Sequence, residues 1–435
     1  MESILIQPII HSVDAVAKVP GSKSLTNRAM MIAALADGRT NLTNALFSDD
    51  SLYFAEALRK LGFEIKLNQL LREITVHGQS GHIPSRKAEL FIGNAGTAAR
   101  FLSAFLTLGN GEFIIDGDAR MRERPIGDLL ATLIQLGANL EPLSQRTSMN
   151  GHEMFPPVKI ISSGLPGGKA NISGNVSSQF LSALLMVSPY AQQPVELKVS
   201  TDLNSKPYID MTVKVMADFG LEIYREGYQW FKIDSGCYQP IKSYAIEPDA
   251  SAASYFFAAA AILGGSVRIE NITRNSKQGD IAFVDVLEKM GCSVKEGLDY
   301  IEVCAPSMPQ ILQGVDVDMR DIPDTAQTLA VIAPFASTPT HIHGIASARV
   351  KESDRVSATC IELARLGIRV EEHQDGMSIY PGDKFIPAKI KTYKDHRMAM
   401  SFALIGLRVG GVIIEDPGCV SKTFPEYFSA LESLR

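Results

Sequence analysis

The chain has 435 residues, of which 46% are hydrophobic, and a formal net charge of −6. Its length exceeds what one hydrophobic core usually covers, so two domains are expected, and its acidic balance argues against nucleic acid as the main partner. Five cysteines, an odd number without a CxxC pair, argue against a disulfide framework and a zinc site.

Six apolar helices are predicted at an almost constant spacing along the chain. Their expected starts are Ser24, Gly96, Ser177, Ala250, Asp324 and Asp395, separated by 72, 81, 73, 74 and 71 residues. A second series consists of glycines that close amphipathic helices, at positions 62, 137, 220, 291 and 367. A glycine after the last helical turn adopts the left-handed conformation at little cost. The repetition predicts six units of one design.

Both series contain one long gap, and it falls at the same place, between Gly137 and Ser177. A single insertion explains both gaps. The proline- and glycine-rich run 141–170 is the candidate for it.

The first helix of each unit is apolar nearly all round, as in SYFFAAAAIL, which indicates burial on every side. None reaches the roughly 18 to 20 apolar residues that a membrane span requires. The start, MESILIQPII, lacks the features of a signal peptide, so we expect a soluble cytoplasmic protein.

A strand is predicted after each buried helix, in TNLTN, EFIIDGD, VELKVS, SVRIEN, THIHG and VIIEDP. Strands and helices therefore alternate, and the fold class is α/β or α+β. Six units divide naturally into three and three, with a crossover near Tyr244–Glu247.

Basic residues concentrate where the helices are expected to begin. The segments are GSKSLTNR, GNAGTAAR, DARMRERP, ARVKESDR, KDHR and CVSKTF. Unpaired N–H groups at helix starts attract anions, and glycine, serine and threonine let an anion approach. Each segment alone is explained by ordinary helix caps and solvated arginines. All of them together indicate a surface that binds anions.

These segments carry a family resemblance. PGSKSLTNRA, GNAGTAAR, ERPI, SSQFLSALL, SKPYIDMT, EPDASAASYF, IPD, RVKESDR, DHRMAMSF and KTFPEYF occur in the order found in 5-enolpyruvylshikimate-3-phosphate (EPSP) synthases. The resemblance spans Pro20 to Phe428. It implies an inside-out α/β barrel of two domains, each with three βαβαββ repeats and pseudo-threefold symmetry. The first domain would be 21–243 and the second 1–20 plus 244–435, with a hinge near Gly21 and Ser243 and the active site in the interdomain cleft.

The resemblance also implies a reaction and its partners. The enolpyruvyl group of phosphoenolpyruvate passes to the 5-hydroxyl of shikimate 3-phosphate by addition and elimination through a tetrahedral intermediate, with release of phosphate. This is a step of chorismate and aromatic amino acid biosynthesis, and it needs no metal and no other cofactor. The inhibitor would be glyphosate, and the enzyme would be a monomer that binds neither nucleic acid nor membrane.

The matched motifs assign the binding residues. Those expected to bind shikimate 3-phosphate are Lys23, Ser24, Arg28, Ser177, Ser178, Gln179, Ser205, Tyr208, Asp324, Ser347 and Lys351. Those expected to bind phosphoenolpyruvate or glyphosate are Lys23, Asn94, Gly96, Arg124, Gln179, Arg355, Arg397 and Lys422. Arginine suits such ligands because its planar group binds carboxylate and phosphate with two donors at once.

The catalytic residues implied by the resemblance are Lys23, Asp324, Glu352, His396 and Lys422. Asp324 would accept the 5-hydroxyl proton, although a cap of its own helix is the alternative. Glu352 would move a proton on and off the methylene carbon, although a charge-rich run is usually a solvated face. His396 and Lys422 would act on the leaving phosphate, and either could carry a proton.

Two positions depart from the family pattern. Phe101 stands where a proline is common, and we expect it to add bulk behind Thr97 and Gly96. Ser347 stands where an asparagine is common, which weakens one expected contact to the shikimate phosphate.

Three other functions are weighed against this one. The sister transferase that acts on UDP-N-acetylglucosamine uses a reactive cysteine in a loop aligned with residues 115–125, where this chain has none. An RNA 3′-phosphate cyclase fits the acidic balance poorly and lacks its histidine motif. A non-enzymatic anion-binding repeat protein would need the basic clusters but not Asp324 and Glu352 among them.

Overall fold

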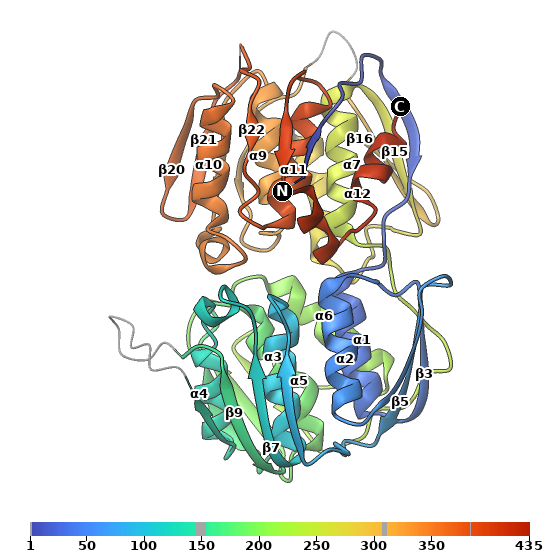
Figure 1. Cartoon of the computed structure of the whole chain (residues 1–435), viewed down its shortest axis with the longest axis vertical. Coiled ribbons are helices and arrows are strands. Elements are labelled where there is room, and N and C mark those ends of the chain that lie inside the picture. The colour runs from blue at the N-terminus through green and yellow to red at the C-terminus, as the bar shows by residue number, and fades with distance from the viewer. Residues whose placement is uncertain (1, 144–153, 307–310, 383) are drawn as a thin grey trace. The chain divides into compact units, whose positions relative to one another are not determined.

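The computed structural model describes residues 2–143, 154–306, 311–382 and 384–435. The chain folds into two compact units (Figure 1). Unit 2 is Gly21–Ile246, and unit 1 combines the residues up to Pro20 with Glu247–Arg435. The repeat pattern predicted the second crossing near Tyr244–Glu247, and the family resemblance predicted it after residue 243. The strand Tyr244–Ala245 pairs with Leu42 and Thr43, and this pairing keeps the chain in unit 2 as far as Ile246.

Unit 2 contains three four-stranded sheets of one design. In each sheet the first pair of strands is parallel and the other two pairs are antiparallel. The strand orders are β14 (Tyr244–Ala245), β3 (Asp37–Thr43), β5 (Glu73–Gln79), β4 (Glu64–Asn68); β6 (Lys87–Phe91), β7 (Asn110–Asp116), β9 (Val158–Ser163), β8 (Asn139–Pro142); and β10 (Gly168–Ile172), β11 (Val195–Val199), β13 (Trp230–Ile233), β12 (Tyr224–Glu226).

Unit 1 repeats the design, and the start of the chain completes it. Two sheets have four strands: β2 (Val13–Ala17), β15 (Gly265–Glu270), β17 (Tyr300–Cys304), β16 (Ser293–Glu296); and β18 (Asp316–Asp318), β19 (Thr340–His343), β21 (Gly376–Ile379), β20 (Val370–His373). The third has three described strands: β22 (Lys389–Ile390), β23 (Ile413–Glu415), β1 (Ser3–Leu5). Two strands before Pro20 thus pair with strands that follow residue 247.

Three buried helices fill each unit, with the sheets outside them (Figure 1). In unit 2 they are α1 (Lys23–Leu35), α3 (Gly96–Phe105) and α5 (Ser178–Val187); in unit 1 they are α7 (Ala250–Leu263), α9 (Ala326–Ile332) and α11 (His396–Gly406). A second helix follows the strand after each: α2 (Asp49–Lys60), α4 (Gly127–Gln135), α6 (Lys206–Asp218), α8 (Phe283–Lys289), α10 (Arg355–Arg365) and α12 (Tyr427–Glu432). The expected alternation of helices and strands in six units is confirmed.

The start of each buried helix lies within two residues of its predicted position. Gly96 and Ala250 are first residues, and Ser177 and Asp395 are the caps just before α5 and α11. The largest difference is at α9, which begins at Ala326, two residues after the predicted start at Asp324.

The predicted helix-closing glycines have the expected backbone. All five have positive φ, from +81° at Gly367 to +100° at Gly291, where other residues are strained. The second repeat of the chain is longer than the first because of the connection between β8 and β9. Residues 143–157 form this connection, whereas residues 69–72 connect the equivalent strands β4 and β5 of the first repeat. Residues 144–153 of the predicted insertion, 141–170, are outside the described residues.

Candidate active site

In unit 2 the predicted residues gather at the N-terminal ends of the buried helices. Lys23 is the first residue of α1, and its Nζ lies 3.5 Å from the buried Asp50 Oδ2. Ser177 caps α5, where its Oγ accepts from Gln179 N, and Gln179 Nε2 donates to Thr97 Oγ1 in the first turn of α3. Ser205, with φ of +58°, is the N-cap residue just before α6, and Tyr208 N donates back to its carbonyl. Contacts between helix starts therefore hold this part of the site together.

Arg28 lies deep beside these groups. It donates from Nε to Thr212 Oγ1 (2.8 Å) and from Nη2 to Ser182 Oγ (3.1 Å), and it also donates to the carbonyls of Ser24 and Tyr208. Within the described residues, no carboxylate lies within ion-pairing distance of its guanidinium. Burial lowers the pKa of Arg28 to about 10, so the side chain still carries its charge at neutral pH. A buried cation without a counter-ion favours an incoming anion.

Gly96 and Arg124 form the second part of this site. Arg124 Nη1 donates to the carbonyl (3.1 Å) and the Oδ1 (2.9 Å) of Asn94, two residues before α3 begins. A Cβ on Gly96 would lie 2.4 Å from Arg124 Nη2, so the guanidinium occupies the space that any side chain at 96 would fill. The absence of a side chain therefore lets a guanidinium lie against the start of α3.

Arg100 stabilises the contact between Arg124 and the start of α3. It is buried, and it donates to the Gly96 carbonyl (3.3 Å) and to the carbonyl of Pro125 (2.8 Å), the residue after Arg124. The sequence placed Arg100 in a basic cluster but gave it no function. The structure shows that it ties the segment of Arg124 to α3.

In unit 1 three cations surround the carboxylate of Asp324. Lys351 Nζ (2.5 Å) and Arg355 Nη1 (3.2 Å) bond to its Oδ1, and Arg397 Nη2 bonds to its Oδ2 at 2.7 Å. The alternative that Asp324 is the N-cap of its own helix is wrong, because Thr325 is the N-cap residue of α9 and its side chain makes no capping hydrogen bond. The partners of Asp324 lie on other segments, and its side chain is 17% exposed.

Arg355 connects three carboxylates. It bonds to Asp324, to Glu352 Oε2 (2.9 Å) and to the fully buried Asp395 (2.8 Å from Nε to Oδ2). Burial by itself lowers the pKa of Arg355, but Asp395, Glu352 and Asp324 outweigh it and raise the pKa above its ordinary value. Glu352 is therefore no solvated residue, because its side chain is only 7% exposed and is fixed beside a permanent cation.

Lys422 and Lys351 lie near these carboxylates. Lys422 is the last residue of the 3₁₀ helix η7 (Pro417–Lys422), and its Nζ is 4.0 Å from Glu352 Oε1. Burial is the largest influence on Lys351 and lowers the pKa of its ammonium group, although Asp324 opposes the shift. Ser347 lies in the 3₁₀ helix η6 (Ala346–Val350), four residues before Lys351, and is partly buried.

The side chain of His396 is fully buried in unit 1. It is the first residue of α11, and its Nδ1 lies 3.5 Å from Asp395 Oδ1. The ring therefore lies within the unit, beside the carboxylate that holds Arg355.

Several residues of these networks were not predicted. They are Asp50, Arg100, Ser182, Thr212, Tyr255 and Asp395. Asp395 caps α11 by accepting from Arg397 N, and it also accepts from Ser353 Oγ. Tyr255 OH accepts from Arg397 Nη1, and burial raises the pKa of this phenol. The sequence signal for Asp395 was its place in KDHR, which a simple helix cap also explains.

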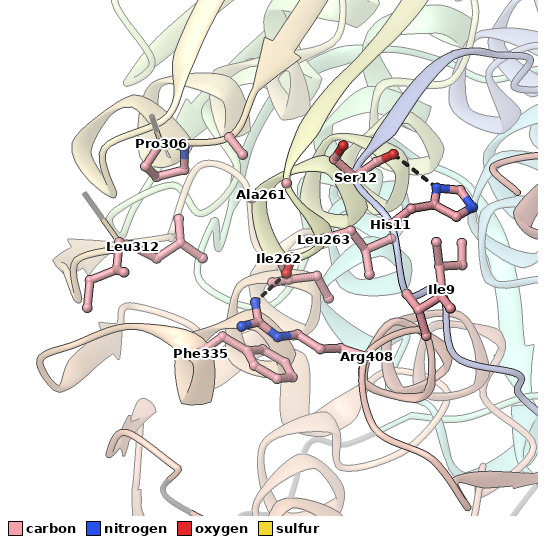
Figure 2. Close-up of a pocket in the computed structure, with 14 residues that line it drawn as sticks. Ile9, His11, Ser12, Ala261, Ile262, Leu263, Pro306, Leu312, Phe335 and Arg408 are labelled. Carbon is pink, nitrogen blue, oxygen red and sulfur yellow. Dashed lines mark hydrogen bonds between the residues drawn. The ribbon is translucent and has the colours of Figure 1, made fainter. Parts of the chain in front are cut away.

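A cavity of about 380 Å³ in unit 1 contains none of the predicted residues (Figure 2). It lies at the opposite ends of the buried helices, where Ile262 and Leu263 end α7 and Phe335 ends the 3₁₀ helix η5 (Ala333–Phe335) behind α9. Arg408 lies over the Phe335 ring, 5.2 Å from its centroid, and donates to the Ile262 carbonyl. A mainly apolar wall whose arginine is already bonded does not suit a polyanion.

Two further observations concern the described residues only. None of their helices is both long and apolar enough to cross a bilayer. They also contain no group of three or more His, Cys, Asp or Glu side chains placed to hold a metal ion.

Comparison with known proteins decides the family. A family model described as EPSP synthase (3-phosphoshikimate 1-carboxyvinyltransferase) matches residues 8–431. The chain belongs to the EPSP synthase family.

Relatives and solved structures of EPSP synthases agree with this placement. The chain is 50% identical over 429 residues to the 3-phosphoshikimate 1-carboxyvinyltransferase of Nostoc punctiforme, covering 99% of this chain and 98% of that protein. It is 46% identical over 436 residues to that of Sulfurovum sp., covering 100% and 99%. An EPSP synthase structure from Acinetobacter baumannii superimposes with a TM-score of 0.78 at 27% identity, covering 99% of this chain and 97% of that one.

Membership of the EPSP synthase family confirms the two-domain α/β fold that the resemblance implied. It also favours the shikimate transferase over the UDP-N-acetylglucosamine transferase and the non-enzymatic repeat protein.

Proposed function

We propose that this chain transfers the enolpyruvyl group of phosphoenolpyruvate to the 5-hydroxyl of shikimate 3-phosphate and releases phosphate. The observation that supports the proposal best is the cluster in unit 1. There, two carboxylates, Asp324 and Glu352, share one buried arginine and lie among further cations. A protein that only binds anions gains nothing from carboxylates in this position, because they repel its ligand.

The substrates divide between the two sets of residues. The residues that bind shikimate 3-phosphate are Lys23, Ser24, Arg28, Ser177, Ser178, Gln179, Ser205, Tyr208 and Lys351, and Ser347 makes a weaker contact. The residues that bind phosphoenolpyruvate are Lys23, Asn94, Gly96, Arg124, Gln179, Arg355, Arg397 and Lys422. Both units would act on one pair of substrates, because the hydroxyl to be deprotonated and the enol to be attacked must meet.

In the addition step, Asp324 accepts the proton of the 5-hydroxyl while the oxygen bonds to C2 of phosphoenolpyruvate and C3 receives a proton. Glu352 supplies that proton. A bound anion beside Glu352 raises the affinity of its carboxylate for a proton, so substrate binding prepares the acid. In the elimination step, Glu352 removes a proton from C3, the C2–O bond to phosphate breaks, and the double bond re-forms.

The cations stabilise the charge that moves in these steps. Arg124, Arg397 and Lys422 hold the phosphate as it leaves, and Lys422 can return a proton to it. We assign His396 a different function from the one the sequence suggested, since its ring lies within the unit beside Asp395. It supports the carboxylate that fixes Arg355 and Arg397.

The proposal extends to inhibition and setting. Glyphosate would occupy the phosphoenolpyruvate position, and no metal ion or other cofactor would take part. We also propose that the enzyme works as a monomer in the cytoplasm. Its five free cysteines support a reducing compartment.

The test is phosphate release with each substrate omitted in turn. Phosphate should appear only when both shikimate 3-phosphate and phosphoenolpyruvate are present, and EDTA should not change the rate. Release with UDP-N-acetylglucosamine in place of shikimate 3-phosphate would overturn the proposal.

A further inference from the structure

Two buried arginines occupy equivalent places in the first two repeats of unit 2. Arg28 on α1 and Arg100 on α3 each donate from Nη1 to the carbonyl four residues earlier, that of Ser24 and that of Gly96. Each guanidinium also lies over a phenylalanine ring from the next buried helix. Arg28 is 5.3 Å from the ring centroid of Phe101, and Arg100 is 6.0 Å from that of Phe180.

The arginine on α1 has all but one of its donors committed within the protein. A guanidinium has five N–H groups in one plane, and four bonds go to Thr212, Ser182, Ser24 and Tyr208. One N–H, on Nη1, has no hydrogen-bond acceptor among the residues that the structure describes, so it can donate to a ligand. The in-plane bonds cannot cover the face of the group, and the fully buried Phe101 ring covers it instead.

The ring also stabilises a charge that no carboxylate among the described residues pairs with. Arg355 is equally buried, but three carboxylates surround it. Around Arg28 the described partners are hydroxyls and carbonyls only. A cation over an aromatic face is stabilised most where water is excluded, so Phe101 partly compensates the charge without neutralising it. A carboxylate at this position would compete with an anionic ligand, whereas a ring does not.

We propose that Phe101 is a positioning residue for shikimate 3-phosphate, which holds the Arg28 guanidinium in the plane that presents its remaining N–H to the ligand. This inference rests on the proposed function, since it takes Arg28 as a contact of that substrate. Its rival is that Phe101 only shapes the start of α3, where Gly96 serves phosphoenolpyruvate.

The experiment removes the ring and measures the two substrates separately. Phe101→Met keeps an apolar side chain that fills irregular space, and Phe101→Tyr keeps the ring. Binding of shikimate 3-phosphate is measured by titration calorimetry on the full chain, and the KM for each substrate by phosphate release. Phe180→Met, under Arg100, is the matched control for loss of a ring in the same layer of helices.

We expect Phe101→Met to raise the Kd for shikimate 3-phosphate about 2- to 30-fold, the range given by cation–π estimates. The KM for phosphoenolpyruvate should stay within about twofold of wild type. Phe101→Tyr should bind shikimate 3-phosphate within about threefold of wild type. Phe180→Met should leave shikimate 3-phosphate binding close to wild type.

A double-mutant cycle separates action through Arg28 from a general effect on packing. In an Arg28→Lys background, which lacks the planar group, Phe101→Met should change the Kd by less than about twofold. The inference would be overturned if Phe101→Met changed the Kd as much in the Arg28→Lys background as in wild type. It would also be overturned if Phe101→Met alone left the Kd unchanged, or if it raised the KM for phosphoenolpyruvate equally. If thermal unfolding shows that Phe101→Met is not folded, Phe101→Leu takes its place with the same expectations.

The failure of this inference differs from the failure of the proposed function. If wild type does not bind shikimate 3-phosphate, the function is wrong. If wild type binds it and the ring-free variant binds it equally well, only the assignment of Phe101 is wrong.

Discussion

The substitution Gly96→Ala tests the geometry of the phosphoenolpyruvate site most directly. Gly96 is the first residue of α3 and its φ is not positive, so alanine fits the backbone. Its methyl group, however, would lie 2.4 Å from Arg124 Nη2, whereas an ordinary contact needs at least 3.4 Å. The guanidinium must therefore withdraw by about 1 Å, which stretches its bonds to Asn94 at 2.9 and 3.1 Å beyond hydrogen-bonding distance.

The loss expected from this displacement is that of one charge-assisted hydrogen bond, about 1.5–3 kcal/mol. The KM for phosphoenolpyruvate should therefore rise about 10- to 150-fold. The inhibition constant for glyphosate should rise further, because the longer inhibitor meets both the displaced arginine and the new methyl group. Steady-state phosphate release, with glyphosate varied against phosphoenolpyruvate, measures both constants.

Gly410→Ala is the matched control, because its added methyl meets nothing closer than 3.8 Å and it follows the far end of α11. It should leave both constants unchanged. If Gly96→Ala leaves the KM for phosphoenolpyruvate unchanged, Arg124 does not hold this substrate. If it weakens both ligands equally, displacement of Arg124 is the whole effect and Gly96 does not select by size.

Three other predictions concern the charged cluster of unit 1. Asp324→Ala and Glu352→Gln should each lower kcat about 10²- to 10⁴-fold while the Kd for shikimate 3-phosphate stays within about tenfold, and near-normal turnover in both would mean that other groups carry the protons. The kcat/KM for shikimate 3-phosphate should decline at alkaline pH with a midpoint below 10.5, because the ligand needs the charged form of Lys351 and burial lowers the pKa of this group. Lys351→Arg should move the midpoint of this decline to higher pH, and an unchanged midpoint would show that Lys351 does not cause the decline. Asp395→Asn should lower the free energy of unfolding by about 1.5–3 kcal/mol in denaturant titrations, because it removes one charge-assisted interaction of the buried Arg355, which keeps Glu352 and Asp324 as partners, and a loss under about 1 kcal/mol would count against this account.

The fold could be predicted from the sequence because six units repeat one pattern. The buried helix and the strand after it each appear six times, and the closing glycine appears five times. An uncertain assignment in one repeat can therefore be checked against the others. The pairing of β14 with β3 could not be predicted. Its two residues form no periodic pattern, and the parallel partner lies about 200 residues earlier.

The site was predictable as a set of segments but not as a set of contacts. Asp324 is the last residue of a short IPD motif and precedes an apolar helix, which is also the pattern of a helix cap. Its real partners lie 27 to 73 residues away in sequence, so only folding reveals them. For the same reason the position of Phe101 was expected to matter through Gly96, five residues before it, whereas its ring lies against Arg28 on another helix.

The two clusters differ in how far their charges are balanced, and this difference suits their functions. In unit 1 the buried Arg355 pairs with three carboxylates (Asp324, Glu352, Asp395), and Lys351, Arg397 and Lys422 lie beside the first two of them. In unit 2 the described partners of the buried Arg28 are hydroxyls and carbonyls, and no described carboxylate lies within ion-pairing distance of its guanidinium. Proton transfer needs carboxylates whose charge is nearly compensated, so that small changes alter their affinity for a proton. Binding a polyanion needs uncompensated charge that is already fixed in place. We therefore expect acid–base chemistry chiefly in unit 1, whereas Arg28 in unit 2 offers a fixed positive charge to the ligand.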